Sequence, residues 1–174
     1  MDGRLYDSRE RGRWIVALGL GSNLGDRLAL LRRAAAELGR GGDTVVVARS
    51  RVCQSPPAGG PPQPDYLDAV VLVRTGLDPR SLLARAQRIE RALGRCRPEP
   101  VRWGPRPIDI DLLWSPGLAV DEPGLTLPHP LLAERPFVLR PLLALVPGAR
   151  DPRSGATYAG LAAARAHLAW LGPL

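Results

Sequence analysis

The chain has 174 residues, of which 45% are hydrophobic, and its 24 basic and 17 acidic side chains give a net charge of +7. This length fits one compact domain with its own core, and no apolar run approaches the ~20 residues that a membrane span requires. All 24 cations are arginine, which excludes chemistry that needs a lysine amine, such as a Schiff base or a P-loop lysine. The positive balance indicates an anionic partner, either nucleic acid or a polyphosphate small molecule.

The compartment and the domain limits follow from the cysteines and the N-terminus. Cys53 and Cys96 alone make neither a disulfide framework nor a metal set. The first residues are charged and lack the apolar segment of a secretory signal. We therefore expect a cytoplasmic protein with a flexible tail over residues 1–13 and a single domain over 14–174.

The first elements along the chain are a strand, a helix and a second strand. The apolar run 14–20 predicts a buried strand, and turn-forming residues follow at 21–26, where either Asn23 or Asp26 could cap the next helix. Apolar residues at helical spacing then predict a helix up to Leu38, which Gly39 would end. The β-branched segment 44–52 predicts a strand.

The middle of the chain alternates loops with regular elements. Residues 54–64 are rich in Pro and Gly and predict a loop, and 66–74 predict a strand. Asp78 and Pro79 are typical of a helix start, and the helix should end at Gly94. An irregular Arg- and Pro-rich stretch over 95–105 leads into a strand over 108–114, which a turn over 115–117 ends.

The last third is harder to assign. Residues 125–132 predict a loop, and 137–145 are apolar but interrupted by Pro141. Residues 158–171 predict an alanine-rich amphipathic helix, on which His167 would be either a surface residue or a core-packing residue.

The mixture of strands and helices lacks a strict βαβα alternation, which favours an α+β fold. We expect a ferredoxin-like antiparallel sheet with flanking helices mainly on one face, and long Pro/Gly/Arg-rich catalytic loops.

The most informative pattern is Asp109-Ile110-Asp111 on the strand 108–114. Side chains alternate along a strand, so both carboxylates face one side, with their Cα atoms roughly 6.5–7 Å apart. They could bridge a pair of hard cations ~3.5–4 Å apart. The alternative is a solvated strand face on which two acids have no role.

Four arginines precede this pair, at positions 95, 97, 102 and 106, with Trp103-Gly104-Pro105 between the last two. Cations beside a metal-binding carboxylate pair suit a polyphosphate ester, whose charge must be neutralised from several sides. The alternative is a solvated basic loop.

Two further patterns are weaker. Gly19-x-Gly21-x-x-x-Gly25 is one residue too long for a dinucleotide fingerprint, and Asp43 is poorly placed for a ribose, so nicotinamide binding is disfavoured. The same turn could still present backbone N–H groups to a ligand. His129 lies between two prolines and no second His or Cys is near, which favours an oriented hydrogen-bonding group over a metal ligand.

Four segments, taken together and in order, resemble the 6-hydroxymethyl-7,8-dihydropterin pyrophosphokinase family of folate biosynthesis. They are LGLGSNLGDR (18–27), SPPAGGPPQPDYLDAV (55–70), IERALGRCRPEPVRWGPRPIDIDLL (89–113) and LPHPLLAERPFVLRPL (127–142). The W-G-P-R-x-I-D-I-D-L pattern is highly specific, and the resemblance spans residues 14–147.

The resemblance implies transfer of pyrophosphate from ATP to the hydroxymethyl group of the pterin, with release of AMP. It implies two Mg²⁺ ions on Asp109 and Asp111, and catalytic roles for these two residues and for Arg95, Arg97 and Arg106. The implied ATP-binding residues are Gln87, Glu90, Arg97, Trp103, Arg106, Ile110, His129 and Arg135. The implied pterin-binding residues are Ser55, Pro56, Ala58, Tyr66, Asp68, Trp103 and Phe137.

Three departures from the family pattern bear on affinity. Asp68 stands where the family usually has asparagine, but a carboxylate can accept from both the 2-amino group and N3–H of the pterin. Residues 98–100 read Pro-Glu-Pro where a further basic residue is expected, and Gly124 stands where some members have arginine.

Two other functions compete with this one. A nucleic-acid-binding module would need exposed aromatic side chains for base stacking, and this chain has one Phe and three Tyr. A different Mg²⁺-dependent nucleotidyl or phosphoryl transferase could use the same carboxylate pair, and release of ADP would reveal attack at the γ-phosphorus. We expect ATP and the dihydropterin as partners, with no nucleic acid, no membrane and a monomeric chain.

Overall fold

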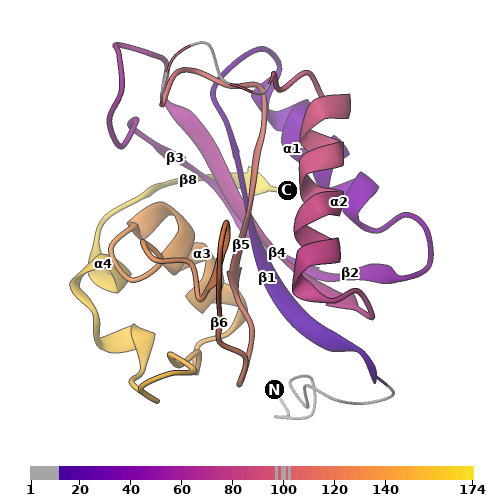
Figure 1. Cartoon of the computed structure of the whole chain (residues 1–174). Helices are drawn as coiled ribbons and strands as arrows, with labels where there is room; N and C mark the ends of the chain where they lie inside the picture. Colours follow the sequence, from indigo (N-terminus) through magenta and orange to yellow (C-terminus); the bar gives the residue numbers. More distant parts are fainter. Residues whose placement is uncertain (1–11, 97, 99–100, 102) are drawn as a thin grey trace.

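A six-stranded antiparallel sheet forms the centre of the computed structural model, which describes residues 12–96, 98, 101 and 103–174 (Figure 1). Its strands are β1 (Trp14–Ser22), β2 (Thr44–Arg49), β3 (Arg51–Ser55), β4 (Tyr66–Thr75), β5 (Asp109–Trp114) and β8 (Ala169–Pro173). The helices are α1 (Arg27–Leu38), α2 (Pro79–Ala92), α3 (Pro136–Leu145) and the short α4 (Ala162–Arg165), with a 3₁₀ turn, η3, at Tyr158–Gly160. Within the described segments, no helix is both long and apolar enough to cross a bilayer.

The strand order confirms the ferredoxin-like prediction. The sheet runs β5-β1-β4-β3-β8, and β2 pairs with β4 beside β3. In chain order, β1, α1, the β2–β3 edge, β4, α2 and β5 form a split βαβ repeat in which neighbouring strands are antiparallel. This order places β1 in the middle, between β4 and β5.

The sheet is covered on both faces, so the expectation of helices mainly on one face is wrong. Val16, Leu18 and Leu20 of β1 pack in one cluster with α1 and α2. Ala17 packs in a second cluster with α3, on the opposite face (Figure 1). The cause is visible in β4, whose central residues 67–73 are all buried, since a strand buried on both faces needs a layer on each side.

The two long helices begin where local chemistry predicts. The Asp26 carboxylate accepts a hydrogen bond from Ala29 N at 3.1 Å, and Asp78 accepts one from Ser81 N at 3.0 Å. Each side chain satisfies an amide that the first turn of a helix leaves without a partner. Pro79 occupies the first turn of α2, where its missing N–H costs nothing.

The C-terminal segment does not form the predicted helix over 158–171. The chain makes the η3 turn and the four-residue α4, and then β8 pairs with β3. Alanine-rich composition favours a helix only weakly, and pairing with an open sheet edge outweighs it. Arg51 and Arg140 lie over the Trp170 ring at 5.8 and 5.6 Å, which ties β8 to the sheet. His167 is exposed and lies outside any helix.

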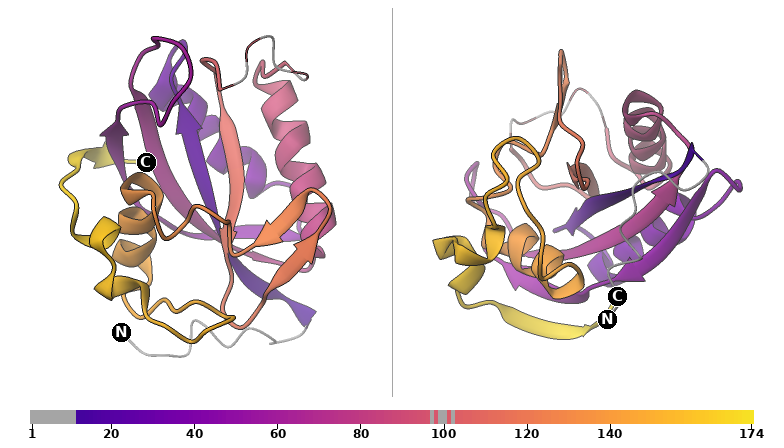
Figure 2. Two further views of the ribbon diagram at one scale, coloured as in Figure 1. Left: turned by 60° about the vertical axis from the view of Figure 1, so that its left-hand side comes forward. Right: turned by 90° about the horizontal axis from the view of Figure 1, so that it is seen from below.

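Two other segments also differ from expectation. The predicted loop over 125–132 begins with β7 (Leu125–Leu127), which pairs with β6 (Val120–Glu122) as a hairpin next to α2 (Figure 2). Gly124 turns this hairpin with a φ of +79°. The apolar segment containing Pro141 is helical, as α3, with Pro136 in its first turn.

The predicted strand over 44–52 is divided at Ser50 into β2 and β3. Ser50 N donates to Val70 O at 2.9 Å, and Ser50 Oγ accepts from Val70 N at 2.9 Å. The hydroxyl therefore replaces a main-chain acceptor at the point where β2 ends and β3 begins. Because Ser50 is buried, no water can substitute for it.

Ser50→Ala is expected to lower the free energy of unfolding by about 1–3 kcal/mol, because Val70 N would lose its acceptor inside the protein. Urea denaturation at neutral pH measures this change. Ser154→Ala, in an exposed turn, is the matched control and should change stability by less than about 0.5 kcal/mol. Equal effects of the two substitutions would contradict the role given to the Ser50 hydroxyl.

Candidate active site

A pocket of about 620 Å³ opens at the ends of β1, β4 and β5. Residues from the loop after β3, from the segment before β5, from the segment 129–135 and from α3 complete its wall. The residues that line it are Gly19, Leu20, Gly21, Ser55, Pro56, Ala58, Gly59, Tyr66, Asp68, Arg95, Trp103, Arg106, Asp109, Asp111, Leu113, His129, Leu131, Glu134, Arg135, Phe137 and Val138.

Two glycines of β1 form the floor of this pocket. Gly21 pairs with Asp68 on β4 and with Asp109 on β5, so these three residues form one row across the sheet. Gly19 pairs with Asp111 in the next row. A Cβ at position 21 would lie 3.2 Å from Asp68 Oδ1, so the glycine leaves room for the carboxylates.

This geometry corrects the expected role of the glycine pattern. Gly19 and Gly21 lie inside β1 and not in a phosphate-binding turn. Gly25 does lie in the turn before α1, with a φ of +66°. The first two glycines of the pattern therefore form the floor of the pocket on β1, and the third belongs to a separate turn before α1.

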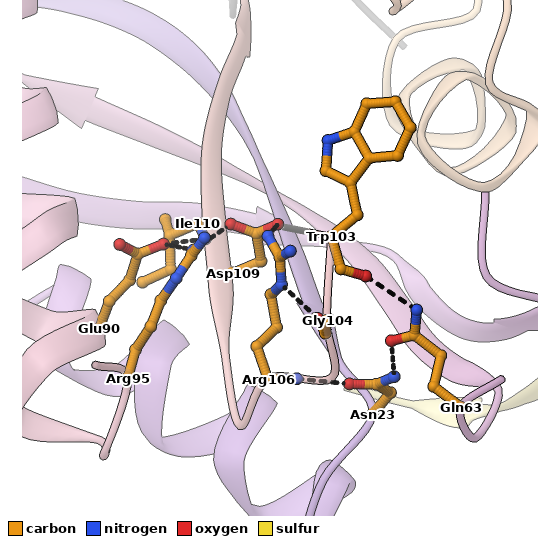
Figure 3. Close-up of polar contacts among 9 residues, drawn as sticks. All are labelled: Asn23, Gln63, Glu90, Arg95, Trp103, Gly104, Arg106, Asp109 and Ile110. Carbon is orange, nitrogen blue, oxygen red and sulfur yellow. Dashed lines mark hydrogen bonds and ion pairs between the residues drawn. The ribbon is translucent and has the colours of Figure 1, made fainter. Parts of the chain in front are cut away.

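Asp109 is held between two arginines (Figure 3). Its Oδ1 accepts from Arg95 Nη1, and its Oδ2 accepts from Arg106 Nη1 at 3.1 Å. Both arginines line the pocket with Asp109, so positive and negative groups converge at one point. Such a site is suited to a polyanion that brings its own cations.

Glu90 of α2 supports this arrangement from behind. Its side chain is 1% exposed, and its Oε1 accepts from Arg95 Nη1 at 2.5 Å and from the main-chain N of Ile110 at 2.8 Å. These two contacts tie α2 to β5 and orient Arg95. The family resemblance implies that Glu90 and Ile110 belong to the ATP site, but neither residue lines the pocket.

Asp111 has a raised pKa, to about 7, which burial causes first and the charges of Asp109 and Glu90 cause second. Arg135 and Arg95 act in the opposite direction. Three acids thus crowd one end of β5, and their mutual repulsion makes added positive charge favourable there.

Asp68 is the acid on the other side of the glycine floor. It is buried, and its Oδ2 accepts from Ser55 Oγ at 2.7 Å. Burial raises its pKa to about 7; the Ser55 hydrogen bond and Arg135 oppose this shift, and Asp109 adds to it. The carboxylate keeps further lone pairs that can accept from a ligand in the pocket.

His129 is held in one orientation, as its flanking prolines predicted. Its N donates to Leu113 O at 2.8 Å, and its Nδ1 accepts from Leu131 N at 3.1 Å. Burial lowers the pKa of the imidazole, and Arg135 lowers it further. The ring is therefore neutral at pH 7, and the hydrogen bond to Nδ1 places the proton on Nε2.

Arg135 and Phe137, at the start of α3, supply a basic and an aromatic side chain to the pocket wall. The Arg135 guanidinium lies 5.8 Å from the centre of the Phe137 ring, and both residues line the pocket. Arg135 is also the residue that precedes the first turn of α3. The helix start thus places a cation and a ring together at the pocket wall.

Most of the predicted site residues converge on this pocket. Those that line it are Ser55, Pro56, Ala58, Tyr66, Asp68, Arg95, Trp103, Arg106, Asp109, Asp111, His129, Arg135 and Phe137. Gln87, like Glu90 and Ile110, is not among the lining residues. Arg97 and Arg102 lie outside the described residues, as do Glu99 and Pro100, and Gly124 lies on the hairpin turn away from the pocket lining.

Sequence reasoning missed some of the wall and the residues that brace it. Leu131, Glu134 and Val138 line the pocket, and no pattern in the sequence singles them out. Asn23 and Gln63 brace the loops without lining the pocket. Their amides lie in Gly/Pro-rich turns, where a side chain that bonds to the main chain is expected, and this signal could have indicated them.

The model of the 7,8-dihydro-6-hydroxymethylpterin-pyrophosphokinase (HPPK) family matches residues 17–147, three quarters of the chain and all of the pocket. The chain belongs to the HPPK family.

Curated relatives agree with this membership. A 2-amino-4-hydroxy-6-hydroxymethyldihydropteridine pyrophosphokinase of Synechocystis sp. is 42% identical over 142 residues, covering 82% of this chain and 71% of the relative. The Methylorubrum extorquens protein of the same name is 46% identical over 130 residues, covering 75% of this chain and 81% of the relative.

Solved HPPK–DHPS structures share the fold of this HPPK member. One in complex with substrates matches with a TM-score of 0.67 at 12% identity, over 87% of this chain and 43% of the solved chain. The Plasmodium falciparum HPPK–DHPS with pterin and p-hydroxybenzoate matches with a TM-score of 0.61 at 15% identity, over 87% and 41%. The chain thus spans less than half the length of these solved chains.

Glu90→Gln is expected to lower the free energy of unfolding by about 2–3 kcal/mol, because Arg95 would lose a buried ionic partner. The matched control is Glu122→Gln, which removes the charge from the exposed Arg80–Glu122 pair at 2.6 Å and should change stability by less than about 1 kcal/mol. Guanidinium denaturation of the two variants measures both. If the buried and exposed pairs prove equivalent, Glu90 does not support the site as described.

Proposed function

We propose that this chain transfers the pyrophosphoryl group of ATP to the hydroxymethyl oxygen of 6-hydroxymethyl-7,8-dihydropterin, releasing AMP, as a step of folate biosynthesis. Membership of the HPPK family over residues 17–147 carries this proposal. The convergence of Asp109, Asp111, Arg95 and Arg106 on a pocket of about 620 Å³ supports it, because that volume suits a nucleotide phosphate chain and a bicyclic ring together.

The reaction depends on Mg²⁺ in this proposal, and the donor set fits that ion. Asp109 and Asp111 offer hard carboxylate oxygens at one pocket wall. The described part of the chain holds no group of three or more His, Cys, Asp or Glu that could bind a metal without help. Mg²⁺ commonly takes one or two carboxylates and completes its shell with phosphate oxygens and water, so the two aspartates would hold two ions only together with ATP.

The ions would polarise the phosphate oxygens and neutralise charge around the β-phosphorus under attack. The chain's own residues supply alignment and further neutralisation. Arg95 and Arg106 both bond to Asp109, which keeps two planar guanidiniums beside the phosphate position. Neutral His129 offers a fixed Nε2–H donor, since its Nδ1 is already engaged.

The nucleotide contacts complete the ATP side of the proposal. Arg97 and Arg135 would bind phosphates, and Gln87 would contact the nucleotide. Glu90 and Ile110 would act from behind the pocket wall through their contact with each other and with Arg95.

The pterin would lie on the other side of the glycine floor, against Tyr66 and Phe137. Pro56, Ala58 and Trp103 line the same part of the pocket, and Asp68 would read the pyrimidine edge of the ring. An amide at position 68 would have one acceptor oxygen and an NH2 group that only donates, whereas the carboxylate has two oxygens that can accept two donors side by side.

The wider setting is part of the same proposal. We place the enzyme in the cytoplasm as a monomer without a nucleic-acid partner, with 14–174 as one domain. Residues 1–11 of the expected tail lie outside the described residues. The scarcity of aromatic side chains, at 5% of the chain, argues against base stacking as its function.

The proposed reaction is tested by incubating the chain with ATP, Mg²⁺ and the dihydropterin alcohol and separating the nucleotides. AMP and a pyrophosphorylated pterin are expected, and omission of Mg²⁺ should abolish both. Asp109→Asn and Asp111→Asn should each reduce kcat/KM by about 10³-fold or more, since charge neutralisation dominates this chemistry. Asp121→Asn, on the exposed strand β6, is the control and should retain activity. Release of ADP would instead indicate a γ-phosphoryl transferase.

Asp68 generates a separate prediction about pterin affinity. Asp68→Asn should weaken dihydropterin binding by about 10-fold and Asp68→Leu by about 100-fold or more, because leucine removes both acceptors. Isothermal titration calorimetry with an unreactive ATP analogue measures both. Equal losses in the two variants would refute the account of Asp68.

The same carboxylate should make binding depend on pH. The pKa of Asp68 is raised to about 7, so the acceptor form is depleted as the pH falls below that value. Affinity of the wild-type chain should therefore fall by up to ~10-fold per pH unit between pH 7 and 5.5. Asp68→Asn should have a flatter profile, because its amide does not titrate there. The charged or titratable groups that interact electrostatically with Asp68 are Asp109, Arg135 and Cys53. All three are present in the wild-type chain and in the Asp68→Asn variant.

A further inference from the structure

Trp103 has an unfavourable backbone conformation at the mouth of the pocket. Its φ is +57°, and it is the one non-glycine residue with a positive φ in the described part of the chain. The residue is also 57% exposed, so burial in a core does not hold it. A bulky residue keeps such a conformation only when its surroundings enforce it.

The enforcing contacts come from the loop between β3 and β4. Trp103 O accepts from Gln63 Nε2 at 2.9 Å (Figure 3). The indole ring lies against Gly59, where an added Cβ would meet Cε3 at 3.1 Å and Cζ3 at 3.3 Å. Both the main chain and the ring of Trp103 are thus in contact with residues 59–63.

Gly60 is the tightest point of this contact. A Cβ at position 60 would lie 3.1 Å from the carbonyl carbon of Trp103, closer still to its oxygen, and 3.0 Å from Gln63 Nε2. The φ of Gly60 is +86°, which also favours glycine. No other residue type allows the Trp103 carbonyl to approach this loop so closely.

Gln63 is itself fixed by Asn23, at the end of β1. Gln63 Oε1 accepts from Asn23 Nδ2 at 2.9 Å, and Gln63 Nε2 also donates to Gly59 O at 3.1 Å. Asn23 is buried and in turn accepts from Arg106 N at 2.7 Å, through its Oδ1 (Figure 3). A continuous set of hydrogen bonds therefore joins β1, the loop after β3 and the segment 103–106.

We propose that Gly60 and Gln63 are positioning residues that hold Trp103 at the pterin side of the pocket. Neither residue lines the pocket, whereas Trp103 and Gly59 both do, so the two act through Trp103. This inference rests on the proposed function, because it assigns Gly60 and Gln63 a role in the binding of the dihydropterin. We assign Trp103 to the pterin side of the pocket because its indole ring contacts Gly59. Gly59 belongs to the same loop as Pro56 and Ala58, which line the pterin part of the pocket in the proposed function.

The first test compares Gly60→Ala with Gly42→Ala in the full chain. Gly42 has a similar φ of +77°, but a Cβ there would meet nothing within 4 Å, so Gly42→Ala carries the backbone penalty without the contact. Gly60→Ala should raise KM for the dihydropterin by about 10-fold and KM for ATP by less, because a displaced wall residue weakens the substrate it contacts. Gly42→Ala should leave both KM values within about two-fold of wild type, and it should lower Tm less than Gly60→Ala, because only the backbone penalty applies there. Equal KM values for the dihydropterin in the two variants would overturn the proposal.

The second test uses Gln63→Glu and a readout that needs no activity. The carboxylate could still accept from Asn23, but it would face the carbonyl oxygens of Gly59 and Trp103 without a proton to donate. In chains labelled with 5-fluorotryptophan, with Trp103→Phe to assign the resonance, Gln63→Glu and Gly60→Ala should shift or broaden the ¹⁹F signal of Trp103 alone.

The two tests distinguish a failure of the proposed function from a failure of the positioning role of Gly60 and Gln63. A chain that forms no AMP would refute the proposed function, while the ¹⁹F spectra would still show whether residues 60 and 63 hold Trp103. An active chain whose Trp103 resonance is unchanged in both variants would overturn the positioning role by itself.

Discussion

The concentration of negative charge at one end of the sheet is the constraint on which the rest of the site depends. Asp109 and Asp111 lie on the same side of β5, and Glu90 approaches them from α2. Like charges at this density are stable only with counter-charge nearby. Arg95 supplies it, because one guanidinium bonds to both Glu90 and Asp109.

The ferredoxin-like sheet makes this concentration possible because its central strand, β1, has glycines at positions 19 and 21, between two strands that carry acids. β1 lies between β4 and β5, and its Gly21 separates Asp68 from Asp109 in a single row. A larger residue at that place would fill the space that a ligand needs. The residues of β1 on the other face, such as Leu18, are fully buried, so the strand supports the core and the pocket at once.

The loops around the pocket are held by side-chain amides and not by regular structure. Asn23 joins the end of β1 to the segment that carries Arg106, and Gln63 joins the loop after β3 to Trp103. Amides suit this task because each offers donors and an acceptor without adding charge to an already charged site. The irregular Pro- and Gly-rich composition of these segments is therefore compatible with defined positions.

The sequence alone was sufficient to predict the elements that depend on interactions between residues close together in the chain. Asp26 and Asp78 start helices through bonds to amides within the same turn, and the alternation of Asp109 and Asp111 with apolar residues places both acids on one face of a strand. The specific W-G-P-R-x-I-D-I-D-L pattern also indicated the family, since chemistry of this kind requires those residue types close together in sequence.

The tertiary structure alone decided the features that join distant parts of the chain. The segment 158–171 looked helical by composition, but β8 pairs with β3 more than a hundred residues earlier. The roles of Glu90, Gly21 and Gln63 likewise depend on partners from other elements, at positions that no local pattern reports. Local propensity is a weak preference for each residue, whereas strand pairing, burial and charge neutralisation act between segments that only the folded chain brings together.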